Sequence, residues 1–421
     1  MFIIYLLISL LIFALEFKIW RTITPTIIIF SGITVVSTLH FLLWSTLEFI
    51  QVNSIIFIYL SIFLLISFTS SLLLFFSYKK NSIIDSHYTK KISINIFTKA
   101  EAILIFLILM LFLLAFIFYA ITEAYKTTGI MAGENFEYLL SYGVVGHSFA
   151  LLMACTPITY LFFNFSTTIF SKRFFLMILC ISLFFLFLKQ VKYWSLVPSV
   201  WIAIINFHLY GVKFNFKFLL KLISFVLLSI IIFFSTYLFG FYAFGVDIDI
   251  YHKIYDTAYH FMGYLFSGII VFSSLVNDGY LYELQYRDVC ATFTGACNII
   301  DFFRGLELYS GDNIFMIDFY TLDNVFNKKG NVPTLWGVFM LHLGWTSFIF
   351  YFLLSLFIYF IFVLSRTRLP VFLYYTGLIS FMFFSWFASY FALLSIYEIP
   401  LLSLFVISFF LIFSKRVVRK A

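Results

Sequence analysis

Long apolar runs separated by short polar segments make up the chain, and this pattern predicts membrane-spanning helices. The runs are roughly 18 to 25 residues long, which is enough for a helix to cross about 30 Å of hydrocarbon. They show no alternation with a period of two, so helices are favoured over the strands of a barrel. We predict eleven spans, at roughly 2–15, 24–47, 54–76, 102–121, 139–165, 174–188, 194–210, 218–243, 333–363, 370–393 and 400–414.

Composition narrows the class further. Hydrophobic residues make up 63% of the 421 residues and charged residues only 11%. A soluble domain is about half apolar and about a quarter charged, so this chain has too little polar surface to be one. We therefore predict an all-α, polytopic integral membrane protein, with residues 1–421 as a single membrane domain. The first run has Glu16 where a signal peptide has small residues, which indicates an uncleaved span.

The charges of the connecting segments alternate along the predicted spans. One side carries 18 of the 26 basic residues, and the other carries 16 of the 19 acidic residues. Basic segments stay in the cytoplasm, so we expect the N-terminus outside and the C-terminus in the cytoplasm. The net charge of +7 sums a basic inner and an acidic outer face, so it gives no support for a nucleic-acid partner.

One connecting segment is much longer than the others. It covers about residues 245–332 and is expected on the periplasmic side, between the eighth and ninth spans. Within it, Tyr259–Val276 is apolar but short for a span, so it is expected to lie at the outer interface as a helix.

Two of the four cysteines, Cys290 and Cys297, lie in this loop. An oxidising outside favours a disulfide between them. A metal site is the alternative, but the pair lacks the two-to-four spacing and a second pair of ligands. Cys155 and Cys180 fall inside spans, where a cysteine is typically small apolar filler.

Basic side chains on the acidic side are candidates for binding an anion. Lys189 and Lys192 form a basic external turn that suits a lipid phosphate, although snorkelling lysines beside Trp194 would give the same pattern. Arg287 and Arg304 suit a bidentate grip on pyrophosphate, and salt bridges to nearby acids are the alternative.

Other polar features are less specific. His147 and His342 fall inside spans, where a histidine either serves function or is neutral and hydrogen-bonded. Asp247 and Asp249 form a D-x-D pattern, which is weak in an acidic loop. No P-loop, G-x-S-x-G or H-E-x-x-H motif occurs in the sequence, so we expect neither a metal nor a cofactor.

The end of the loop and the next span resemble a known family. Residues 330–336 read GNVPTLW and residues 341–345 read LHLGW. They are similar to the N-V-x-T … F-G-W pattern of bacterial oligosaccharide repeat-unit polymerases, the Wzy-type O-antigen polymerases. Tyr264–Phe272 resembles the short glycine-containing aromatic helix of their periplasmic loop, and the number of spans also matches. His342 replaces the acid common in that motif, so a role for that acid is in doubt.

The resemblance implies a membrane glycosyltransferase. It would move a growing glycan from undecaprenyl pyrophosphate to a hydroxyl of a new lipid-linked repeat unit at the periplasmic face, without a metal. Arg287, Arg304 and Lys192 would stabilise the leaving pyrophosphate. Substrate contacts would come from Asn331, Thr334, Lys189 and His260, and the general base is open among Glu283, Asp301 and His260.

Other functions remain open from the sequence. An O-antigen ligase would place a histidine near residue 334, and a lipid-phosphate-sugar-dependent glycosyltransferase would use Asp247 and Asp249. A flippase or transporter of lipid-linked oligosaccharides is the alternative outside enzymology, and its usual pseudo-repeated halves are not evident. The sequence also leaves open a chain-length regulator as a partner.

Overall fold

Helices form nearly all of the described chain, as the apolar runs predict. The computed structural model describes residues 1–78, 97–131, 133–189, 192–211, 250–279, 288–306, 320–324 and 327–418, together with residues 220, 223–224, 227, 230–235 and 238. Ten helices within these residues are long and apolar enough to cross a membrane. The prediction of an all-α polytopic membrane protein is confirmed.

The chain folds into two compact units, each assembled from separate stretches of sequence. The first unit contains Met1–Ser86, Tyr259–Leu364 and Phe381–Tyr397. The second unit contains His87–Ala258, Ser365–Ser380 and Glu398–Ala421. The helices α11 (Ile250–Asn277), α16 (Leu369–Met382) and α17 (Ser395–Val418) contribute residues to both units.

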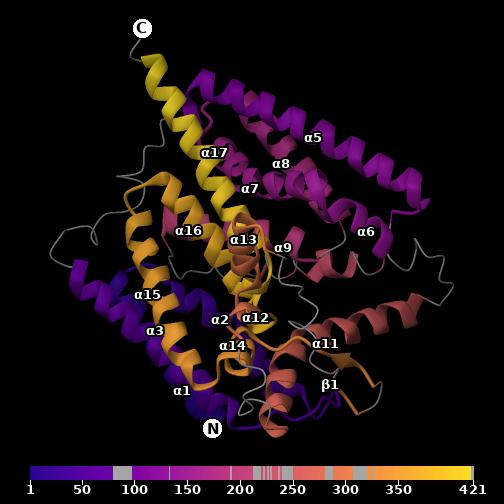
Figure 1. The fold of residues 1–421 in the computed structure, drawn as a ribbon, viewed down its shortest axis with the longest axis vertical. Helices are drawn as coiled ribbons and strands as arrows, with labels where there is room; N and C mark the ends of the chain where they lie inside the picture. The colour runs from indigo at the N-terminus through magenta and orange to yellow at the C-terminus, as the bar shows by residue number, and fades with distance from the viewer. Residues whose placement is uncertain are drawn as a thin grey trace. The chain divides into compact units, whose positions relative to one another are not determined.

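The first unit is built around three helices at its N-terminus, of which α2 runs antiparallel to α1 and α3. Phe2 stacks on Phe41, so α1 begins where α2 ends, and Trp20 donates a hydrogen bond to Ser71 where α3 nears its end. Figure 1 shows α1, α3 and α15 next to one another. The helices and strands of this unit are α1 (Phe2–Trp20), α2 (Pro25–Leu43), α3 (Ile56–Tyr78), α11 from Tyr259, α12 (Val289–Thr292), α13 (Thr294–Arg304), β1 (Tyr320–Thr321), β2 (Lys329–Gly330), α14 (Leu335–Leu343), η6 (Gly344–Thr346), α15 (Ser347–Ser365) through Leu364, η7 (Phe383–Trp386) and η8 (Tyr390–Ala392).

A short hairpin marks one end of the first unit. Strands β1 and β2 pair in antiparallel fashion, with Tyr320 opposite Gly330. The loop between α2 and α3 joins them, because Ile50 N donates to Leu322 O at 3.0 Å and Asn324 N donates to Glu48 O at 3.0 Å. We call this the hairpin end, defined by residues 44–55 and 320–334. Two loops far apart in sequence therefore lie on the same side of the unit.

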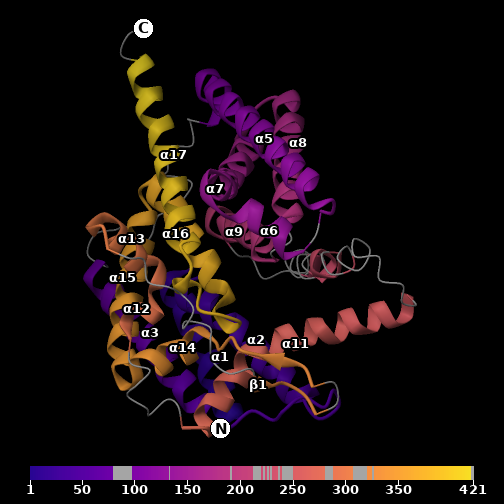
Figure 2. The same ribbon diagram turned by 45° about the vertical axis from the view of Figure 1, so that its right-hand side comes forward.

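The second unit packs its helices through aromatic side chains. Phe162 stacks on Phe106 and Phe175, which come from three neighbouring helices, with ring centroids 4.7 Å and 5.1 Å apart. Figure 2 shows α5, α7 and α8 side by side. The helices of this unit are α5 (Ala100–Thr128), α6 (Glu134–Ser141), α7 (Gly143–Phe165), α8 (Ile169–Leu188), α9 (Lys192–Tyr210), the part of α11 before Tyr259, α16 up to Ser380 and α17 from Glu398.

Two predicted spans and one predicted loop helix differ from the structure. The apolar stretch Tyr259–Val276 is helical as expected, but it belongs to α11, whose 28 residues are long and apolar enough to span a membrane, and its position at the outer interface stays a prediction. The single helix expected over 333–363 breaks at Gly344, which ends α14 with φ 54° and ψ −134°. The helix expected over 370–393 ends at Met382 and continues as the short turns η7 and η8. The span expected over 218–243 lies largely outside the described residues.

Candidate functional site

The family-like segment 330–344 lies where several parts of the first unit meet. Gly330 packs so tightly that an added Cβ would lie 2.5 Å from Ser267 Oγ of α11. Thr334 N donates to Gly268 O of α11 at 3.3 Å, and Asp288 N donates to His342 O at 3.0 Å. The structure therefore brings together the two sequence segments that carry the resemblance, Tyr264–Phe272 and the segment that starts at Gly330.

Thr334 sets the start of α14. Its Oγ1 accepts a hydrogen bond from Gly337 N at 3.1 Å, which satisfies one of the unpaired N–H groups at a helix N-terminus. The side chain is fully buried, as are all nine residues of α14. The structure gives Thr334 a capping role, and its expected contact with a sugar stays a prediction.

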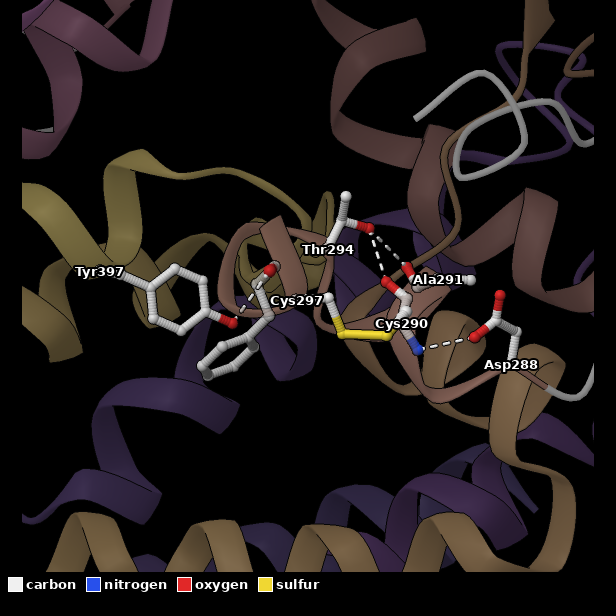
Figure 3. The surroundings of a disulfide bond; sticks show 7 residues. Asp288, Cys290, Ala291, Thr294, Cys297 and Tyr397 are labelled. Atoms are coloured by element: carbon white, nitrogen blue, oxygen red, sulfur yellow. Dashed lines mark hydrogen bonds between the residues drawn. A yellow bond between two sulfur atoms is a disulfide. The ribbon is translucent and has the colours of Figure 1, made fainter. Parts of the chain in front are cut away.

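A disulfide joins Cys290 of α12 to Cys297 of α13, as the sequence predicts, and Figure 3 shows its surroundings. Asp288 caps α12 by accepting from Cys290 N at 2.7 Å, and Thr294 Oγ1 donates to Cys290 O at 2.7 Å. Gly295 packs against the backbone of Leu393, which an added Cβ would meet at 2.8 Å. These contacts hold the start of α13 against the rest of the first unit.

Removing this disulfide is expected to loosen the start of α13 without unfolding the protein. The pair closes a short loop, with a sequence separation of 7. Closing such a loop stabilises the folded state by about 2.5 kcal/mol in the chain-entropy model. Replacing both Cys290 and Cys297 with serine should therefore lower the thermal transition, measured on purified protein in detergent. Reducing the wild type should give the same shift, and a wild type with two free thiols in the peptide 288–303 would contradict the assignment.

Arg304 is the last residue of α13 and is exposed. Its neighbours Phe302 and Phe303 are 71% and 82% exposed, so a cation lies among apolar side chains that face outwards. A basic residue in the last turn also stabilises the negative end of the helix dipole. This combination of a guanidinium and exposed aromatic rings suits an anionic group attached to a lipid.

Asn331 and His260 also belong to the first unit. Asn331 is half-buried and lies between β2 and α14. His260 is half-buried on α11, and its ring packs edge-on against Tyr264 at a centroid distance of 4.7 Å. Asp301, one of the candidate bases, lies on α13 three residues before Arg304. Arg287 and Glu283 lie outside the described residues.

Lys189 belongs to the second unit and is buried. Its Nζ lies 3.6 Å from the ring centroid of Trp194 and 5.2 Å from that of Phe149. Burial lowers the pKa of Lys189 to about 7, while Glu137 and Glu398 act in the opposite direction. These contacts support the interpretation of a lysine packed against Trp194, rather than one open to a phosphate. Lys192 opens α9, and its side chain lies outside the described part of the chain.

Two polar contacts are not evident from the sequence. His147 Nδ1 and Glu398 Oε1 lie 2.6 Å apart in the second unit, although 251 residues separate them. The sequence feature that indicates this contact is Glu398, an acid at the start of the last predicted span. Asp288 is the second case, and its position two residues before Cys290 is typical of a cap.

The comparisons with known proteins give one family. A family model described as a family of unknown function (DUF6337) matches residues 55–418. No curated protein and no solved structure matches the chain.

Proposed function

The chain belongs to the DUF6337 family of unknown function, and we propose that it is a membrane glycosyltransferase that polymerises lipid-linked oligosaccharide repeat units. The observation that carries this proposal is the hydrogen bond from Thr334 N to Gly268 O. It joins the two segments that resemble repeat-unit polymerases, which are otherwise separated by the 57 residues from 273 to 329. The many membrane helices fit a lipid-linked substrate.

The proposed reaction transfers the growing glycan from undecaprenyl pyrophosphate to a new lipid-linked unit. The bond from the anomeric carbon to the pyrophosphate oxygen breaks, and a bond to the acceptor hydroxyl oxygen forms. The acceptor proton leaves to a base or to the departing pyrophosphate. Because pyrophosphate is a good leaving group, the enzyme has to align the acceptor and stabilise the departing charge, and metal-independent chemistry suffices.

Arg304, Arg287 and Lys192 are the proposed cations that stabilise the departing pyrophosphate. Arg304 is the one whose side chain lies in the described part of the chain. Its exposure next to Phe302 and Phe303 supports contact with a lipid-linked pyrophosphate. Asn331, placed by the capped start of α14, would hold a sugar hydroxyl, and Asp301 or His260 would accept the proton. Lys189 would act through its contact with Trp194 rather than by direct binding.

The proposed orientation places the hairpin end at the periplasmic face of the inner membrane. The alternation of basic and acidic segments supports this, with the N-terminus outside and the C-terminus inside. The hydrogen bonds between residues 44–50 and 322–324 agree with it, because the charge pattern assigns both loops to the same side.

A flippase of lipid-linked oligosaccharides is the second candidate, and one observation favours it. Helix α14 is a fully buried half-helix that ends at Gly344, before η6 and α15 begin. Discontinuous helices of this kind often border the binding sites of transporters.

Deleting the gene distinguishes these functions. Without a polymerase, ligation and export continue while elongation stops, so the surface glycan should consist of single repeat units on a gel. Loss of a ligase would leave no glycan on the lipid core, and loss of a flippase would trap lipid-linked units on the inner side. The wild-type gene on a plasmid should restore the ladder. A full ladder in the deletion strain would refute the proposal.

A further inference from the structure

Glu16 is a carboxyl group buried among helices. It lies on α1 of the first unit, four residues before the helix ends, and its side chain is 0% exposed. Its hydrogen-bond partners in the described structure are the hydroxyls of Thr24 and Tyr359. Lys18 and Arg21, the nearest basic residues in sequence, are both exposed. Within the described chain, Glu16 is therefore hydrogen-bonded to hydroxyl groups and not to a cation.

A chain of hydroxyl groups from three other helices surrounds this carboxyl. Tyr359 Oη of α15 lies 2.8 Å from Glu16 Oε1, and Thr26 Oγ1 of α2 lies 2.6 Å from Tyr359 Oη. Ser67 Oγ of α3 lies 2.7 Å from Thr26 Oγ1. Thr24, in the turn before α2, contacts the second carboxyl oxygen. We call Glu16, Thr24, Thr26, Ser67 and Tyr359 the Glu16 cluster, and all five side chains are buried.

The hydrogen bonds of the cluster have a direction. Tyr359 has one hydroxyl proton, so when it donates to Glu16 it must accept from Thr26. Thr26 in turn accepts from Ser67. Every proton in this chain then points towards the carboxyl, which suits an ionised Glu16. Each hydroxyl can also rotate and reverse its bond. The same chain can then accept a hydrogen bond from the O–H group of the protonated carboxyl.

The cost of burying charge decides which form prevails. An ionised carboxylate without a cation loses much of its hydration free energy on burial. Two hydroxyl donors recover part of this loss, because a hydrogen bond to a charged group is stronger than one between neutral groups. The loss and the recovery are of the same order. The carboxyl group can therefore change its protonation state without a large change in the stability of the cluster.

We infer that the Glu16 cluster is a buried proton-binding site, with Glu16 as the group that gains and loses the proton. Thr24 provides the exchange route, because it contacts Glu16 and lies in the short turn that follows the exposed Arg21. The hydroxyl chain through Tyr359 stabilises the ionised form after the proton has left. The site lies at the opposite end of α1 from the hairpin end, so it is separate from the family-like segment.

The helices packed around the Glu16 cluster contribute the other side chains that could respond to pH. From α15 the titratable neighbour is Tyr359, while α2 and α3 present the hydroxyls of Thr26 and Ser67. Trp20 of α1 donates to Ser71 and covers the same region. Among the described contacts of the cluster, Glu16 and Tyr359 are the titratable groups, and a carboxyl group loses its proton far more readily than a tyrosine hydroxyl.

Infrared difference spectroscopy tests the inference on the full-length protein in lipid. The wild type should show the carbonyl stretch of a protonated acid at about pH 5, and this band should convert to carboxylate bands by about pH 9. Glu16→Gln should lack the titrating band, and its amide can keep the packing of the neutral acid. The matched control is Glu101→Gln, since Glu101 is an exposed carboxyl in the first turn of α5, and it should retain the band.

Three outcomes would overturn the inference. Carboxylate bands alone at every pH would mean that Glu16 is permanently ionised. An acid band that does not change with pH would mean a fixed structural group. A titration that moves to lower pH with sodium, but not with choline, would make the cluster an alkali-cation site instead. Tyr359→Phe provides a second readout, because loss of a donor to the carboxylate should move the titration to higher pH even if Glu16→Gln fails to fold.

Discussion

Gly268→Ala is expected to destabilise the first unit by about 3 kcal/mol, the upper range for overpacking a tight site. An added Cβ would lie 2.4 Å from Trp386 O and 2.9 Å from Phe387 O. Both are backbone atoms of the segment at η7, so no side-chain rotation relieves the clash. A shift of α11 would also stretch the hydrogen bond from Thr334 N to Gly268 O. The measurement is the thermal transition of purified protein, followed by size-exclusion chromatography after heating.

Gly263→Ala is the matched control on the same helix. Within the described residues, nothing beyond its own stretch of helix lies within 4 Å of the position that its Cβ would take. Alanine is about 1 kcal/mol more favourable than glycine inside a helix, so this variant should be as stable as the wild type or more stable. Equal stability of the two variants would show that α11 and η7 do not pack as described. It would also remove the contact on which the proposed function depends.

The spans were predictable because each depends on local composition. A helix such as α3 needs only an apolar run long enough to satisfy its own backbone groups in lipid. The break at Gly344 was not predictable in this way, since Leu335–Ser365 is apolar on both sides of it. Its φ of 54° and ψ of −134° form a backbone conformation that favours glycine, and a hydropathy pattern does not describe backbone conformation. The length of α11 was underestimated because its first turns contain the polar residues Tyr251, His252 and Lys253.

The candidate site was predictable only in part, for a related reason. The disulfide follows from two nearby cysteines in an outer loop, which is local information. The position of Thr334 at a loop-to-helix junction was also readable, but its burial depends on α11, which is distant in sequence. The two interpretations of Lys189, an anion-binding cation or a lysine packed beside Trp194, could not be separated from the sequence, because Trp194 has no defined direction until α9 forms. The Glu16 cluster needs four segments at once, so it could not be predicted from a single acid at the end of the first apolar run.

Arg304→Lys is expected to lower glycan polymerisation by a factor of about 10²–10³, the usual effect of losing one donor aimed at a developing charge. Lysine keeps the positive charge but loses the planar fork that binds pyrophosphate through two parallel hydrogen bonds. The substitution also separates catalysis from stability. A lysine at the end of α13 interacts with the helix dipole as an arginine does, so the thermal transition should not change. The measurement is the ladder of surface glycan when the variant replaces the wild type at equal expression.

Arg173→Lys is the control for this prediction, because Arg173 is also an exposed arginine, on α8 of the second unit and outside the proposed site. It should give a wild-type ladder, while Arg304→Lys and Arg287→Lys should both approach the single-unit pattern of the deletion strain. If Arg304→Lys lowered the thermal transition together with the ladder, its role would be structural rather than in binding pyrophosphate. Full ladders from both arginine variants would show that neither is the clamp. Lys192 would then be the next candidate for the leaving-group site.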